Sequence, residues 1–251
     1  MKVVENKDTV NAAASVNAFW MSNEITNSEY REYVRYVKQH PEELMCWIDL
    51  AEVVKGNDIP KTKDGMQKHI KTVKYSEIVT DIIDDSKFPC DNYFTNKKYD
   101  NYPVVGVSQR HARFYCNWKT KMENDRLIKN SKPTIHDYRL PTEVEWTYVA
   151  TQTQAKNAKK LPENVINPSK SNAPNSWGLY NLSGNVSEWT SSNSETKLDE
   201  ANLGTTQQNL KIVRGGSWRT SPNSVERKAI DQNTKEDYIG FRIVTSALSK
   251  K

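Results

Sequence analysis

Cysteine, histidine and long apolar runs are all scarce in this chain of 251 residues. The three cysteines (Cys46, Cys90 and Cys116) form no CxxC motif and pair with no histidine, so the sequence predicts no zinc site and at most one disulfide. No apolar run approaches the roughly 20 residues that a membrane span needs. The segment Met1–Ala14 has no apolar core of a signal peptide. We therefore expect no membrane insertion and no signal peptide within this sequence.

A large excess of one charge is also lacking, because 36 basic residues face 31 acidic ones and leave a net charge of +5. The basic clusters at 61–74 and 156–160 accompany no nucleic-acid-binding motif, so we interpret them as solvated surface and expect no nucleic-acid partner. Aromatic residues, by contrast, are abundant, with 7 Trp, 12 Tyr and 5 Phe. Disordered chains are poor in such residues. The sequence therefore predicts a folded protein whose loops are held by buried rings.

Three helix starts are indicated by their capping residues. Thr26 with Glu29, and Thr142 with Glu145, form capping boxes, in which the threonine accepts from an amide three residues on and the glutamate reaches back. Ser108 is a good N-cap for a further helix. Short strands are expected at 19–21, 104–107, 211–214 and 241–244. Helices, short strands and long irregular segments together predict an α+β fold.

A single domain is expected at 17–247, preceded by a loose arm or edge strand at 1–16. Residues 41–100 are rich in Lys and Asp with scattered apolar residues, and we interpret them as an insertion in this domain. Apolar side chains beside charges make this insertion an expected partner surface.

Six sequence blocks follow one another in order along the domain. They are FWMSNEITNSEY at 19–30, YPVVGVS at 102–108, RLPTEVEW at 139–146, WGLYNLSGNVSEW at 177–189, VRGGSW at 213–218 and IGFR at 239–242. This series resembles the formylglycine-generating enzyme (sulfatase-modifying factor) domain family. The resemblance implies an α+β fold that is a formylglycine-generating-enzyme-like variant of the C-type lectin fold, with little regular secondary structure and long ordered loops.

The catalytic cysteines of that family have no counterpart here. Members that oxidise a sulfatase cysteine use two cysteines shortly after the Gly-Gly-Ser block, which bind copper and activate oxygen. Thr220 and Val225 stand at the matching positions, and no cysteine follows Cys116 in the sequence. Copper(I) requires soft thiolate ligands. The resemblance therefore implies a scaffold with no oxidase activity, no copper and no catalytic residues.

A second lineage of the fold holds one iron with two histidines and a carboxylate, which requires clustered histidines. The four histidines of this chain lie apart, at positions 40, 69, 111 and 136. We interpret each as an ordinary surface or half-buried residue, and the sequence predicts no iron site of this kind.

The block at 177–189 implies one structural calcium. In the family an Asn side chain, a Glu side chain and two backbone carbonyls wrap this ion, and the matching positions are Asn181, Gly184, Val186 and Glu188. Hard oxygen ligands suit calcium. A polar turn closed by Trp189 is the alternative interpretation. The family's other calcium loop has no counterpart at 151–170, so we expect one ion at most.

The resemblance without its catalytic groups implies a non-catalytic structural, assembly or binding module with protein partners. One expected setting is a larger assembly, as for the related lipoproteins of gliding motility and type IX secretion, which form a periplasmic ring beneath the outer membrane. The alternative is a virion or receptor-binding protein that displays the loop at 219–238, located in a virion or the cytoplasm. A second alternative is an unrecognised metal-dependent oxidase on the same fold. The candidate partner or ligand residues of that loop are Arg219, Glu226, Arg227 and Asp231.

Overall fold

The structure is a computed structural model that describes residues 2–4, 17–40, 43, 82–135, 137–151, 164–171, 173–194, 210–220 and 226–246. The elements in chain order are β1 (Lys2–Val4), β2 (Phe19–Met21), α1 (Asn27–Gln39), the short 3₁₀ helices η1 (Asp85–Lys87) and η2 (Lys97–Tyr99), α6 (Gln109–Lys129), α7 (Glu143–Ala150), β3 (Ser187–Asn193), β4 (Leu210–Arg214), β5 (Arg227–Asp231), β6 (Ile239–Gly240) and β7 (Val244–Ser246). Within the described residues, the connections at 100–108 and 173–186 contain no helix or strand, in agreement with the long ordered loops that the resemblance implies.

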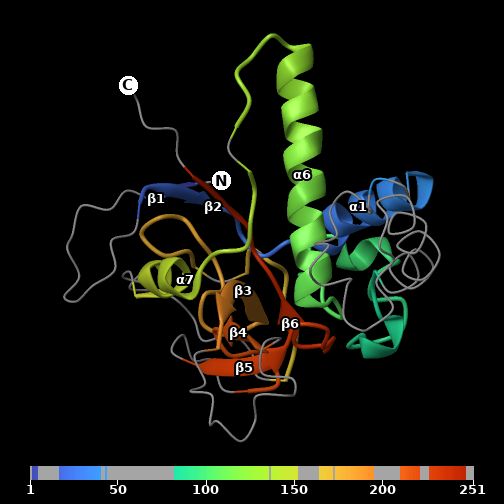
Figure 1. The fold of residues 1–251 in the computed structure, drawn as a ribbon. Coiled ribbons are helices and arrows are strands. Elements are labelled where there is room, and N and C mark those ends of the chain that lie inside the picture. Colours follow the sequence, from blue (N-terminus) through green and yellow to red (C-terminus); the bar gives the residue numbers. More distant parts are fainter. Residues whose placement is uncertain are drawn as a thin grey trace, which may run out of the picture.

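The described strands form two small sheets. In one, β2 lies between β1 and β7 and is antiparallel to both, so segments near the two ends of the chain meet in a single sheet. The other has the order β5-β4-β3-β6, with β3 antiparallel to β4 and parallel to β6. In Figure 1, α6 extends away from the four-stranded sheet with α1 beside it, and α7 lies next to β3. No helix among the described residues combines the length and apolarity needed to cross a bilayer.

The predicted helix starts are confirmed by their cap geometry. The backbone N–H of Thr26 donates to Glu29 at 2.9 Å, and the N–H of Glu29 donates back to the Thr26 hydroxyl, which begins α1. The same reciprocal pair begins α7, and Ser108 accepts from the backbone three residues on to begin α6. These contacts are local, which explains why the sequence alone predicts them.

The strand predictions are confirmed for β2 and β4 but wrong for two other segments. Residues 104–107 form a buried loop, in which the N–H of Val104 donates to Ile25 and the N–H of Gly106 to Glu236. Gly106 has a φ of 71°, which interrupts an extended strand. The segment expected at 241–244 lies mostly between β6 and β7. Both segments are largely apolar and buried, and a short apolar run does not distinguish a buried loop from a buried strand.

The core is rich in aromatic rings, as predicted. Between α1 and α6, the ring of Tyr115 stacks on Tyr30 at a centroid distance of 5.7 Å and meets Phe241 edge-on at 5.4 Å. All three side chains are almost fully buried. The rings thus connect both helices to the segment before β7 and fix the position of the loops around it.

Candidate functional site

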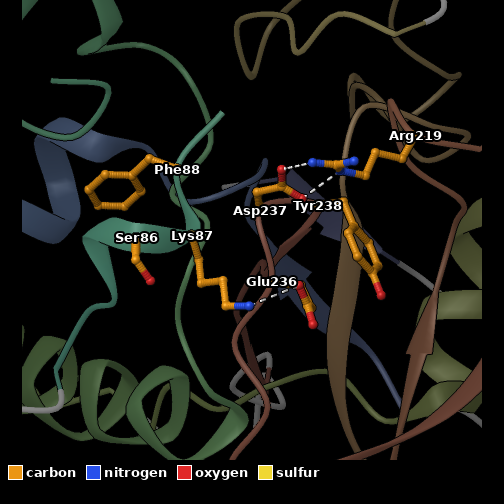
Figure 2. Close-up of a pocket in the computed structure, with 7 residues that line it drawn as sticks. All are labelled: Ser86, Lys87, Phe88, Arg219, Glu236, Asp237 and Tyr238. Carbon is orange, nitrogen blue, oxygen red and sulfur yellow. Dashed lines mark hydrogen bonds and ion pairs between the residues drawn. The ribbon is translucent and has the colours of Figure 1, made fainter. Parts of the chain in front are cut away.

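A pocket of about 440 Å³ opens where three separate segments of the chain meet. One wall comes from η1 and the residue after it, a second from the segment before β6, and the third from the loop after β4 (Figure 2). The lining residues are Ser86, Lys87, Phe88, Arg219, Glu236, Asp237 and Tyr238.

The wall at 236–238 is held rigidly by its backbone. The carbonyls of these three consecutive residues each accept a hydrogen bond, from the N–H of Gly106 at 3.0 Å, from the indole Nε1 of Trp218 at 3.0 Å and from the N–H of Ser187 at 2.8 Å. The donors belong to three different parts of the chain. The side chains of this wall are therefore presented on a fixed backbone, which suits recognition.

The charged pair of Arg219 and Asp237 closes one side of the pocket. The guanidinium Nε donates to Asp237 Oδ1 at 2.7 Å and Nη2 donates to Oδ2, a two-pronged arrangement. The guanidinium also lies 4.6 Å from the ring centroid of Trp218. Hydrogen bonding to Asp237 raises the pKa of Arg219. Asp237 is buried and both its oxygens are used by Arg219.

Lys87 and Glu236 form a looser pair on the other side. The Lys87 Nζ lies 3.9 Å from Glu236 Oε2, with 44% and 34% of the two side chains exposed. Figure 2 shows Lys87 reaching across from η1 to Glu236, below the contact of Arg219 with Asp237. An ion pair of this length between exposed groups contributes little and opens easily.

Thr220, at the position that the resemblance gives to a copper-binding cysteine, is bonded into its own loop. Its Oγ1 accepts from the N–H of Ser217 at 2.9 Å and donates to Glu226 Oε2 at 3.1 Å. Val225, the second such position, lies outside the described residues. Among the described residues no group of three or more His, Cys, Asp or Glu could hold a metal. The Thr220 loop is therefore organised around a hydroxyl group and not a thiolate.

The two described cysteines lie elsewhere in the chain. Cys116 is buried within α6, and burial raises the pKa of its thiol. Cys90 is exposed, with its Sγ 3.3 Å from the hydroxyl of Tyr99. His111 was expected at or near the surface but is buried, and burial lowers the pKa of its imidazole to about 3.

The structure separates the four loop residues proposed to contact a partner. Arg219 lines the pocket and Glu226 holds Thr220 in the adjoining loop. Arg227, on β5, instead donates to Glu143 of α7 at 2.7 Å. Asp231 accepts from the N–H of Asn233 at 2.8 Å and closes the turn after β5. The pocket residues that the sequence did not single out are Ser86, Lys87 and Phe88, from the predicted insertion, and the wall at 236–238, which ends the predicted loop at 219–238.

The proposed calcium ligand Glu188 is completely buried and already has strong partners. Its carboxylate accepts from Nε and Nη2 of Arg242, each at 2.6 Å, and from the indole Nε1 of Trp146 at 2.6 Å. Asn181 accepts from the hydroxyl of Ser171 at 3.2 Å. In this arrangement Glu188 does not fit a calcium ion, because both its oxygens face a guanidinium.

The other two proposed calcium positions, Gly184 and Val186, are also built into the fold. The N–H of Gly184 donates to the carbonyl of Gly215 at 2.7 Å, and Val186 is buried in the core. Calcium at Asn181, Gly184, Val186 and Glu188 is implied by the sequence resemblance alone and stays a prediction, while the contacts of Glu188 oppose it, because binding would require Glu188 to leave Arg242.

A second buried carboxylate, Glu24, lies beside this pair. It accepts from Nδ2 of Asn181 at 3.0 Å and from Nδ2 of Asn185 at 3.0 Å. Burial first, and the charge of Glu188 second, raise the pKa of Glu24 well above its ordinary range, against the opposing effect of Arg242. We call Glu24, Glu188 and Arg242 the buried charge cluster. It joins the first, fourth and sixth sequence blocks, and its residues were not recognised as one group from the sequence.

Comparisons with known proteins agree with this architecture. A family model described as the sulfatase-modifying factor enzyme 1-like domain matches residues 2–247. The chain is 25% identical over 258 residues to the inactive C-alpha-formylglycine-generating enzyme 2 of Bos taurus, covering 89% of this chain and 75% of that protein. It is 28% identical over 185 residues to the formylglycine-generating enzyme of Mus musculus, covering 59% and 45%. Among solved structures, CarF matches with a TM-score of 0.60 at 18% identity, over 98% of this chain and 93% of that one.

Proposed function

The chain belongs to the sulfatase-modifying factor enzyme 1-like family and has its formylglycine-generating-enzyme-like variant of the C-type lectin fold, and from that premise we propose that it is a non-catalytic protein-binding module. Its partner occupies the pocket formed by residues 86–88, 219 and 236–238. No residue of the pocket is assigned a catalytic role.

The observation that carries this proposal is the hydrogen bonding of the Thr220 hydroxyl within its loop. In an oxidase of this family a thiolate at that position would face the metal, whereas here the hydroxyl is bonded on both sides, to Ser217 and to Glu226. A hydroxyl group does not replace a thiolate as a copper(I) ligand. One relative that covers most of the chain is itself named inactive, which supports the same conclusion.

The pocket has the properties of a recognition site. The backbone of its wall at 236–238 is held by hydrogen bonds, the pocket carries two rings and four charged side chains, and one ion pair is weak enough to be exchanged for contacts with a partner. Arg and Tyr, both present here, are enriched at the residues that contribute most to protein binding.

A photo-crosslinking residue at Ser86, in protein isolated from its own source, tests the proposal. Ser86 is exposed at the pocket, and Lys129, exposed at the end of α6, provides the control position. We expect Ser86 to crosslink one defined polypeptide in stoichiometric amount and Lys129 not to do so. Equal crosslinking from both positions, or stoichiometric copper or iron in the purified protein, would contradict the proposal.

We further propose that the module is a subunit of a larger assembly such as a gliding-motility or type IX secretion ring. The competing proposal is a virion or receptor-binding protein that displays the loop at 219–238. Native mass, together with the identity of the co-purifying chains, separates the two, since a ring subunit co-purifies with its ring neighbours and a displayed protein with virion chains. A lone chain near 28.9 kDa would contradict the assembly.

A further inference from the structure

We propose that the pocket binds an acidic segment of its partner polypeptide, with a partner carboxylate held between Lys87, Arg219 and Tyr238. This inference rests on the proposed function and specifies the chemistry of the partner. The pocket's unused hydrogen-bonding groups and its charges carry the inference.

Hydrogen-bond donors outnumber acceptors among the unused groups of the pocket. Arg219 uses Nε and Nη2 on Asp237, and its Nη1 makes no hydrogen bond to a described residue. The hydroxyl of Tyr238 likewise makes none within the described part of the chain, and it is half-buried. Burial and the nearby carboxylate of Glu236 raise the pKa of Tyr238, so its hydroxyl keeps its proton and can donate. With the Lys87 ammonium, three separate groups are able to donate to an incoming anion.

Acceptors for a cationic partner are fewer. Both oxygens of Asp237 are taken by Arg219, which leaves the carboxylate of Glu236 as the charged acceptor. Glu236 already faces Lys87. A partner carboxylate would take the place of Glu236 at Lys87, and Glu236 would turn toward solvent, to which a third of its side chain is already exposed.

The net charge of the whole chain also favours an acidic partner. A net charge of +5 favours the approach of acidic segments over basic ones at low ionic strength. Binding should therefore weaken as salt is added, because exposed charges are screened over about 8 Å at physiological ionic strength.

The test uses three acetylated and amidated hexapeptides, Gly-Ser-X-X-Ser-Gly, in which X is Glu, Gln or Lys. Binding is followed through the NMR signal of the Trp218 indole N–H, which donates to the backbone of Asp237 beside the pocket. We expect the Glu peptide to bind most tightly and the Lys peptide least. Lys87→Met should weaken the Glu peptide roughly fivefold, and Glu236→Gln should tighten it by roughly twofold or more.

Two control variants show whether a change in peptide binding depends on residues of the pocket. Lys97→Met removes an exposed lysine from η2, and Glu123→Gln removes a carboxylate that pairs with Arg126 on α6, and neither residue lines the pocket. Both should leave peptide binding unchanged. Tighter binding of the Lys peptide, no difference between the Glu and Gln peptides, tighter binding by Lys87→Met or weaker binding by Glu236→Gln, or no binding at millimolar peptide would each overturn the inference. If the Ser86 crosslink persists in those cases, partner binding at the pocket stands and only the acidic chemistry fails.

Discussion

The buried charge cluster and the pocket contain the same kinds of ionic groups but differ in their access to water. Arg242 and Glu188 are 0% and 1% exposed, whereas Arg219 is 52% exposed and Lys87 is 44% exposed. Water is excluded around the first pair, so every donor of the guanidinium must find an acceptor inside the protein. Arg242 does so by donating also to the carbonyls of Ser22 and Tyr180.

This difference assigns the two regions different roles. A buried pair is strongly destabilising when one member is removed, because the other is left charged and desolvated. A pair at a pocket mouth contributes little to stability and can exchange its partner for a ligand. The buried charge cluster therefore connects the sequence blocks, while the pocket charges are available for recognition.

The largest effect is expected for Arg242→Met. This variant leaves Glu24 and Glu188 together without their shared cation. Loss of one member of a buried pair costs about 3–5 kcal/mol, so urea unfolding should show a loss of that size. Lys87→Met is the control from the pocket and should cost about 0–1 kcal/mol, because both side chains of its pair with Glu236 are partly exposed. Equal losses in the two variants would remove the proposed distinction between the regions.

The pH dependence of stability is expected to follow Glu24. Its pKa is raised in the folded protein, so the folded chain keeps a proton that the unfolded chain has already lost. The contribution of Glu24 to the free energy of unfolding is therefore fully present below the ordinary pKa of a glutamate. It is lost as pH rises through the raised pKa of the folded state. Glu24→Gln should flatten this fall in urea unfolding measured from pH 5 to pH 9. An unchanged slope would show that Glu24 ionises without penalty.

Calcium, if it bound at the site implied by the sequence blocks, would compete with Arg242 for the carboxylate of Glu188, and a variant of intermediate expected effect tests this. Because Glu188 is already held by the guanidinium and the Trp146 indole, we expect the melting temperature to be the same with calcium and with chelator. Glu188→Ala should lower it under both conditions. A calcium-dependent rise in the wild type that Glu188→Ala abolishes would instead confirm the calcium site implied by the sequence blocks.

The sequence predicted the features that depend on near neighbours. Both capping boxes join residues three positions apart, so their spacing is visible in the sequence. The order of the six sequence blocks likewise indicated the family and its fold. The partners of Glu188 were not predictable in this way, because Arg242 lies 54 residues further on and either residue alone reads as an ordinary surface charge.

The pocket was only partly predictable for the same reason. The loop after the Gly-Gly-Ser block indicates Arg219 as a candidate, but Lys87 belongs to a segment whose mixed sequence pattern predicts no position relative to that loop. Arg227 has the same polar character and pairs instead with Glu143. Polarity identifies candidate surface residues, whereas tertiary contacts decide which of them share a pocket.

The smallest change in stability, with a clear change in binding, is expected for Tyr238→Phe. This substitution removes only the hydroxyl, which makes no hydrogen bond within the described residues, and keeps the half-buried ring. The free energy of unfolding should change by less than about 0.5 kcal/mol. The Glu hexapeptide should bind roughly two- to fivefold more weakly, because one donor to its carboxylate is lost. Tyr99→Phe is the control, since that hydroxyl contacts Cys90 outside the pocket. If Tyr238→Phe lowers the free energy of unfolding by as much as it weakens the free energy of peptide binding, the hydroxyl is structural. The contrast between a stabilising interior and an exchangeable pocket then does not extend to this residue.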